Sequence, residues 1–175
     1  MNRILEAAQF SANAHAGQFR KYGDNPLPYA VHPARVAGWC AILPEASEEM
    51  VITAYLHDVL EDTTVTVNEI RQKFGQEVAD MVIALTKIKF PGENRKARNE
   101  RYLLGLQAAN QCVQTIKLLD RIDNLQDIVG GPVDFQILYA KESIELNAAL
   151  HGANVHLAIR LRQMAERILR KNKVS

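Results

Sequence analysis

Residues 56–64, LHDVLEDTT, place one histidine and three carboxylates next to an apolar run. On a helix, side chains four positions apart lie about 5–6 Å apart at their Cβ atoms, so Glu61 stacks near His57. In the same way, Asp62 stacks near Asp58. The neighbours His57 and Asp58 point about 100° apart, so both bind one ion only when it lies close to the helix. The stretch therefore predicts half of a metal site, with two more carboxylates one turn away.

Two further side chains of suitable type stand in apolar surroundings elsewhere, His32 at a helix entrance and Asp120 in the middle of a helix. Two histidines and two carboxylates form a mixed nitrogen and oxygen set, which suits a divalent transition ion such as Mn²⁺ or Fe²⁺. Because the set lacks thiolates, structural zinc is disfavoured. A buried salt-bridge network with Arg35 and Arg121 is equally favoured by spacing alone, because buried carboxylates need partners.

The length and composition of the chain limit the classes of protein to which it can belong. The chain has 175 residues, enough for one domain with a sizeable core, and we expect a single domain over residues 1–175. With 21 Lys and Arg against 20 Asp and Glu, its formal charge of +1 argues against a nucleic-acid or membrane-surface partner. No run approaches the roughly 20 apolar residues of a membrane span. Cys40 and Cys112 lack CxxC spacing, which indicates reduced thiols and a cytoplasmic protein.

The elements that must position these groups are predicted to be helical nearly throughout. Apolar spacing and capping residues predict helices near residues 4–15, 34–42, 48–60, 67–74, 76–87, 94–109, 112–129, 133–150 and 153–170. Gly23, Pro26 and Pro28 predict a loop, and Thr66 with Glu69 predicts a capping box. A short hairpin near residues 87–90 stays open. The predicted fold is an all-α, compact single domain.

Four segments together resemble a known family. They are HAGQFRKYGDNPLPYAVHPARVA, AYLHDVLEDTTVT, ALTKIKF and IKLLDRIDNLQDI, and they are similar to the HD-superfamily hydrolase domain of the Rel/Spo alarmone enzymes. The likeness covers roughly residues 12–128, and the C-terminal helices match only in character. With this length and no synthetase or regulatory segment, the chain resembles the stand-alone small alarmone hydrolases.

The resemblance implies an activity and a set of roles. The expected activity is Mn²⁺-dependent removal of pyrophosphate from the 3′ position of guanosine 3′,5′-bis(diphosphate) and its pentaphosphate relative, with water as the nucleophile. The matched metal ligands are His32, His57, Asp58 and Asp120, and the matched catalytic acids are Glu61 and Asp62. The matched substrate-binding residues are Arg20, Lys21, Tyr29, Lys87 and Asn124.

Two departures from the family pattern leave the substrate open. Gln126 stands where members commonly have Arg, and Asp123 stands where they often have His or an aromatic residue. With fewer guanidinium donors, the site would bind a distal phosphate more weakly. An adenosine alarmone or NADPH is therefore an alternative substrate. A non-catalytic nucleotide-binding protein with a retained metal site is a second alternative. The oligomeric state, including a homo-oligomer, stays open.

Other polar residues have plainer interpretations. His15 is expected to pack or to form hydrogen bonds rather than to bind an ion. The basic run over residues 95–101 is either a wall that attracts polyphosphate or a solvated face paired with Glu93 and Glu100. Tyr22, like Tyr29, is a candidate for stacking on a purine.

Overall fold

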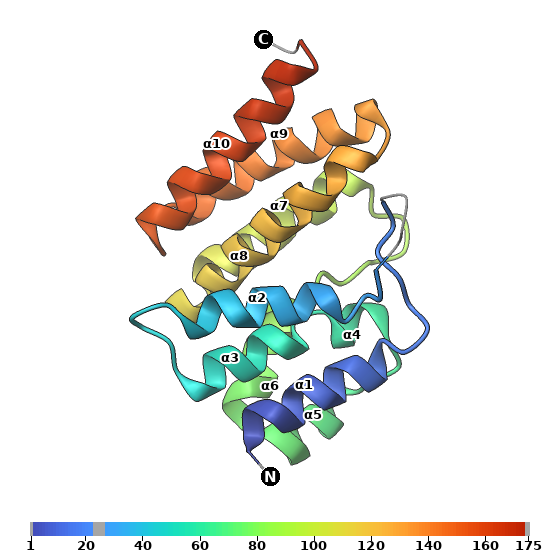
Figure 1. Cartoon of the computed structure of the whole chain (residues 1–175), viewed down its shortest axis with the longest axis vertical. Helices are drawn as coiled ribbons and strands as arrows, with labels where there is room; N and C mark the ends of the chain where they lie inside the picture. Colours follow the sequence, from blue (N-terminus) through green and yellow to red (C-terminus); the bar gives the residue numbers. More distant parts are fainter. Residues whose placement is uncertain (1, 23–26, 174–175) are drawn as a thin grey trace.

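The computed structural model describes residues 2–22 and 27–173, so Gly23 and Pro26 of the predicted loop lie outside it. The described residues form ten α-helices and one 3₁₀ turn (Figure 1). The helices are α1 (Arg3–Ala14), α2 (Val31–Ala41), α3 (Glu48–Leu56), α4 (Val59–Asp62), α5 (Val67–Phe74), α6 (Gln76–Leu85), α7 (Arg95–Ala108), α8 (Gln111–Asp127), α9 (Val133–Leu150) and α10 (Val155–Lys171), with the 3₁₀ turn η1 (Ile128–Gly130) after α8. Within these ranges the only β pairing is an isolated bridge between Phe19 and Pro28. The all-α prediction is confirmed.

Polar side chains define where most helices begin. The Oδ1 or hydroxyl oxygens of six residues accept hydrogen bonds from free backbone amides in the first turn; they are Asn2, Ser47, Thr66, Asn94, Asn110 and Asn154. The predicted capping box is present, because Thr66 Oγ1 accepts from the Glu69 amide while the Glu69 carboxylate accepts from the Thr66 amide. Gly75, with φ of +93°, separates α5 from α6. These local signals explain why the predicted helices agree closely with the observed ones.

Two hydrophobic clusters make up the core of the described residues. The larger one joins α2, α3 and α6 to α10, and α8 supplies six of its fully or almost fully buried side chains: Val113, Ile116, Leu118, Leu119, Ile122 and Leu125. The smaller one lies among α1, α3, α5 and α6 around Ile52, Leu56 and Phe74. Figure 1 shows α9 and α10 at one end of the molecule and α1, α5 and α6 at the other. Helix α3 contributes buried side chains to both clusters, so it lies between them.

The predicted helix over residues 48–60 is wrong in one respect, since the structure divides it. Helix α3 ends at Leu56, and His57 and Asp58 form a turn before α4 begins at Val59. The carbonyl of Asp58 accepts from the amides of Glu61 and Asp62, so α4 has its own first turn. The apolar spacing continues through the buried Val59, and for that reason the sequence does not reveal the break.

Smaller differences concern the ends of other elements. Helix α2 begins at Val31, three residues earlier than predicted, and Pro33 lies in its first turn as expected. Helix α10 begins at Val155, and α8 gives way to η1 after Asp127. Residues 86–90 have no regular secondary structure, so the hairpin left open by the sequence does not form there. No described helix combines the length and the apolar character that a membrane crossing needs.

Candidate active site

The four predicted metal ligands come from three separate places in the chain and converge on one point. His32 Nε2 lies 3.1 Å from His57 Nε2 and 3.4 Å from Asp58 Oδ2. His57 Nε2 and Asp58 Oδ2 are 3.1 Å apart. Asp120 Oδ1 lies 3.2 Å from His32 Nε2 and 3.7 Å from His57 Nε2. His57 and Asp58 occupy the turn between α3 and α4, where their ligand atoms lie close enough to face one centre.

These separations fit a shared divalent ion. Ligand atoms about 2.1 Å from a metal are about 3.0 Å apart at right angles and about 3.4 Å apart at tetrahedral angles. His32, His57 and Asp58 also form the group of potential ligands whose atoms all lie within 4.8 Å of one another. His32 and Asp120 are buried, and buried carboxylates need a cation or hydrogen-bond donors. The donor set of imidazoles and carboxylates suits a divalent transition ion.

Both histidines are held so that Nε2 faces the centre. His57 Nδ1 donates to the carbonyl of Ala54, 2.8 Å away. His32 Nδ1 donates to Asp123 Oδ2 at 2.6 Å, and Asp123 is fully buried. Arg35 supports Asp123 through an ion pair of 2.7 Å between Nε and Oδ1. Asp123, which the sequence marked as a departure from the family pattern, thus contacts and orients a candidate metal ligand.

Nearby carboxylates raise the pKa values of both histidine rings. Burial by itself lowers the pKa of His32, but the hydrogen bonds that its ring donates to Asp120, Asp123 and Asp58 raise it well above the usual range. For His57, burial also lowers the pKa, while Asp58 and Asp120 raise it to about 9. The raised pKa values of both rings reflect the negative charge that the surrounding carboxylates place at this centre.

Asp120 has two partners beyond the histidines, both on its own helix. Lys117 Nζ forms an ion pair with Asp120 Oδ2 at 2.6 Å, and Asn124 Nδ2 donates to Asp120 Oδ1 at 2.5 Å. Burial raises the pKa of Asp120, but Lys117 and the histidines hold it well below the usual range. Lys117 was not among the predicted site residues, although its position three residues before Asp120 on a helix is a usable signal.

The two predicted catalytic acids stand beside the centre on α4 and are exposed. Asp62 Oδ2 accepts from the Tyr29 hydroxyl at 3.2 Å, and the same hydroxyl donates to Asp58 Oδ2 at 2.6 Å. Glu61 Oε2 accepts from the backbone amide of Lys87 at 2.9 Å. Desolvation raises the pKa of both carboxyls, and for Asp62 the nearby Asp58 adds to the effect. Raised pKa values suit groups that exchange protons near neutral pH.

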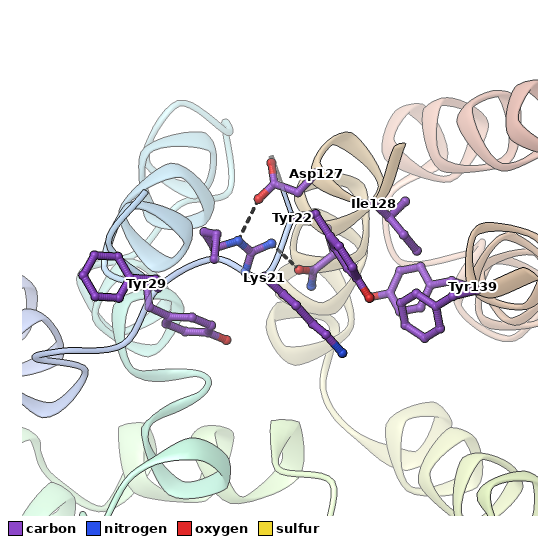
Figure 2. A pocket seen from close by; sticks show the side chains of 10 residues that line it. Lys21, Tyr22, Tyr29, Asp127, Ile128 and Tyr139 are labelled. Carbon is purple, nitrogen blue, oxygen red and sulfur yellow. Dashed lines mark hydrogen bonds and ion pairs between the residues drawn. The ribbon is translucent and has the colours of Figure 1, made fainter. Parts of the chain in front are cut away.

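A pocket of about 230 Å³ adjoins this centre. Its polar lining includes Arg20, Lys21 and Asn124, and its aromatic lining consists of Phe19, Tyr22, Tyr29, Phe135 and Tyr139. Figure 2 shows the side chains that line the pocket, with Tyr29, Asp127 and Tyr139 among those labelled. The Arg20 guanidinium lies between two partners. Its Nε donates to Asp127 at 2.7 Å, and its Nη2 donates to Asn124 Oδ1 at 2.7 Å. Four of the five predicted substrate-binding residues therefore line one pocket.

Lys87, the fifth of these residues, lies in a separate narrow crevice with Asn99, Tyr102 and Arg121. Gln126 is exposed and does not line the pocket. His15 is buried and bonds to Gln18, and its ring packs against Tyr29, in line with the expected packing role.

Two of the four cations in the basic run on α7 have the acidic partners that the paired-face interpretation predicted, and a third pairs with a different residue. Arg101 pairs with Glu93, and Lys96 lies 3.8 Å from Glu100, as the paired-face interpretation predicted. Arg95 pairs with Glu142 of α9 at 2.6 Å.

Comparisons with known proteins agree with this geometry. A family model described as HD domain matches residues 7–156. A guanosine-3′,5′-bis(diphosphate) 3′-pyrophosphohydrolase of Aquifex aeolicus is 38% identical over 148 residues, which cover 84% of this chain and 21% of that protein. The bifunctional (p)ppGpp synthase/hydrolase SpoT of Escherichia coli is 33% identical over 163 residues, covering 89% of this chain and 22% of that protein. The chain thus spans about a fifth of the length of these curated relatives.

A solved structure resembles the chain over its whole length. It is described as a metazoan ortholog of SpoT that hydrolyzes ppGpp and plays a role in starvation responses. The match has a TM-score of 0.80 and 25% sequence identity, and it covers 100% of this chain and 98% of the other.

Proposed function

The chain belongs to the HD domain family, and from that premise we propose that it hydrolyses guanosine 3′,5′-bis(diphosphate) and its pentaphosphate relative, releasing the 3′-diphosphate as pyrophosphate. The observation that carries the proposal is the convergence of four side chains of metal-binding type beside two carboxyls of raised pKa and an aromatic, basic pocket. The names of the relatives and of the structural neighbour support the same reaction. Residues 1–175 would act as one catalytic domain.

We assign His32, His57, Asp58 and Asp120 to a divalent ion, and we propose Mn²⁺ because the donor set mixes imidazoles with carboxylates. When bound, such an ion polarises a phosphoryl oxygen and lowers the pKa of water. Asp123 and the Ala54 carbonyl hold the two rings with Nε2 free for it. Lys117 and Asn124 hold Asp120 in its place.

Glu61 and Asp62 would accept and donate the protons that the reaction transfers. In the reaction, a water oxygen bonds to the phosphorus attached to the ribose 3′-oxygen, and the bond between that phosphorus and the 3′-oxygen breaks. The water loses a proton, and the 3′-oxygen gains one. Carboxyls whose pKa is raised by desolvation can do both, since they accept a proton readily and release it again. The Tyr29 hydroxyl links Asp62 to Asp58 and so positions one acid beside the metal ligands.

The adjoining pocket would bind the nucleoside. Its rings offer stacking surfaces for a purine, and Arg20 and Lys21 offer positive charge to phosphates. Arg20 is already paired with Asp127, so it is pre-positioned rather than mobile.

The acid pair provides the test of the mechanism. Replacing Glu61→Gln together with Asp62→Asn should abolish Mn²⁺-dependent pyrophosphate release, while a nucleotide binding assay still detects the substrate. Lys96→Gln, a change at an exposed residue of α7, is the matched control and should keep full activity. Undiminished turnover in the double variant would refute the assigned roles.

A substrate panel tests the nucleotide. The panel contains guanosine 3′,5′-bis(diphosphate), the corresponding adenosine alarmone and NADPH, and it scores pyrophosphate separately from orthophosphate. We expect pyrophosphate from the guanosine compound to dominate. Orthophosphate from NADPH as the main product would replace the proposed substrate.

A further inference from the structure

Asp62 lies at the end of a helix that is too short to hold its own shape. Helix α4 consists of Val59–Asp62, and the amides of Glu61 and Asp62 both donate to the carbonyl of Asp58. A single helical turn is only weakly stable by itself, because helix formation is cooperative. The carbonyl of Asp62, at the last position of α4, has no acceptor role inside that helix. Contacts from other parts of the chain must therefore fix the position of this acid.

Gln18 supplies one of these contacts. Its side-chain Nε2 donates to the backbone carbonyl of Asp62 at 2.8 Å, across 44 positions of the chain. The backbone carbonyl of Gln18 accepts from the amide of Tyr29 at 2.9 Å. The Tyr29 hydroxyl in turn donates to the Asp62 carboxylate at 3.2 Å. Gln18 therefore supports Asp62 directly at its backbone and, through Tyr29, at its carboxylate.

His15 holds the Gln18 side chain in the orientation that this contact needs. A backbone carbonyl only accepts hydrogen bonds, so the Gln18 NH₂ group must face Asp62 and its Oε1 must face His15. Oε1 also only accepts, so His15 Nδ1 carries a hydrogen and donates to it at 2.8 Å. Gly17, with φ of +79°, lies in the turn in which the Gln18 amide donates to the His15 carbonyl at 3.0 Å. The chain of donors and acceptors thus runs in one direction, from His15 to Asp62.

The ring of His15 does more than fill space. His15 is 2% exposed, and its ring centre lies 4.6 Å from that of Tyr29. Its Nε2 is buried and has no hydrogen-bond partner among the described residues. An unpaired buried nitrogen costs free energy, so an apolar side chain would serve better if packing were the only role of this position. The contact between Nδ1 and Gln18 gives the polar ring a role that packing does not.

We propose that His15 and Gln18 are positioning residues that act on the reaction through Asp62. The inference rests on the proposed function for the role of Asp62 as an acid. Neither His15 nor Gln18 lines the nucleotide pocket. Loss of their contacts lets α4 move and misplaces the carboxyl that exchanges protons during the reaction. Because the groups that bind the substrate stay in place, kcat should fall while KM stays nearly constant.

The first measurement follows the backbone and needs no substrate. Amide hydrogen exchange, read by mass spectrometry, compares the full wild-type chain with Gln18→Leu, which keeps a similar side-chain size but has no donor. Gln163→Leu, the same change at an exposed residue of α10, is the control. Residues 59–65 should exchange about three- to tenfold faster in Gln18→Leu, as expected for the loss of one hydrogen bond. The control should exchange there at the wild-type rate.

The second measurement follows turnover of guanosine 3′,5′-bis(diphosphate) with Mn²⁺. For Gln18→Leu we expect kcat to fall about tenfold or more, with KM and the calorimetric Mn²⁺ affinity within about twofold of the wild type. His15→Asn retains a donor near the position of Nδ1, whereas His15→Phe retains a ring against Tyr29 but has no donor. His15→Asn should therefore keep more of kcat than His15→Phe. A role in packing alone predicts the reverse order.

The outcomes separate this proposal from the proposed function. If the wild type hydrolyses none of the nucleotides, the proposed function fails, and faster exchange in Gln18→Leu still supports the positioning of Asp62. Unchanged exchange over residues 59–65 overturns the positioning even if the wild type is active. In an active enzyme, an unchanged kcat, a loss carried by KM, or a lower Mn²⁺ affinity overturns it as well. If the His15 variants do not fold, as followed by circular dichroism, Gln18→Leu carries the test.

Discussion

Replacing Asp123→Asn should weaken metal binding without touching a metal ligand. Asp123 is fully buried, its Oδ2 accepts from His32 Nδ1 at 2.6 Å, and its Oδ1 pairs with Arg35 at 2.7 Å. Both partners are donors, whereas an asparagine offers one acceptor oxygen and one donor NH₂. If the amide NH₂ faces His32, the Nδ1–H group meets a donor and the ring loses its fixed orientation. If the amide oxygen faces His32, the hydrogen bond goes to a neutral instead of a charged acceptor and Arg35 Nε faces a donor, so the ring is held less firmly.

The expected magnitude follows from this loss. Removing such an outer partner typically costs 10–100-fold in metal affinity, which corresponds to about 1.4–2.7 kcal/mol of binding free energy. We expect Mn²⁺ titration by calorimetry to show this change, and urea denaturation to show a free energy of unfolding lower by about 1.5–3 kcal/mol. Asp127→Asn is the control, because Asp127 contacts Arg35 at 3.1 Å but does not contact His32.

The control variant should keep the metal affinity of the wild type within about twofold. If Asp123→Asn is folded and binds Mn²⁺ as tightly as the wild type, then Asp123 does not orient His32 and the reasoning fails. A loss of similar size in Asp127→Asn would show a general disturbance of charge instead.

Three further predictions address the pocket, a helix start and a thiol. Gly131→Ala would place a methyl group 2.9 Å from Cε1 of Tyr22, so the ring must move and the KM for the nucleotide should rise while Mn²⁺ affinity stays constant. Thr66→Ala removes half of the capping box of α5 and should lower the free energy of unfolding by about 0.5–2 kcal/mol in urea, whereas a shift below this range would contradict the cap. Burial raises the pKa of Cys40 to about 12, so iodoacetamide at pH 8 should modify it only after unfolding. The unfolded chain releases the Cys40 thiol proton near pH 9, whereas the folded chain keeps it until the pH approaches 12. The free energy of unfolding should therefore fall as the pH rises from 9 to 12.

The local structure followed from local sequence signals, because helix caps and apolar spacing act within one or two turns. Thr66 with Glu69 marked the start of α5, and the spacing in the C-terminal half marked α9 at its observed limits. The break at His57 and Asp58 escaped notice, since the buried Val59 continues the apolar pattern across it. Short-range signals report which residues are helical but not where tertiary contacts interrupt a helix.

The sequence by itself determined the chemical types available at the site, two imidazoles and several carboxylates in apolar surroundings, and it determined the helices that carry them. Only the tertiary structure decided which of them meet. The contact between His32 and Asp123 joins residues 91 positions apart, and Arg20 meets Asp127 across 107 positions. Such pairings depend on how α2 and the loop before it pack against α8, which is set by the burial of side chains throughout the larger core cluster. That packing turned Asp123 from an apparent departure into a support for a metal ligand.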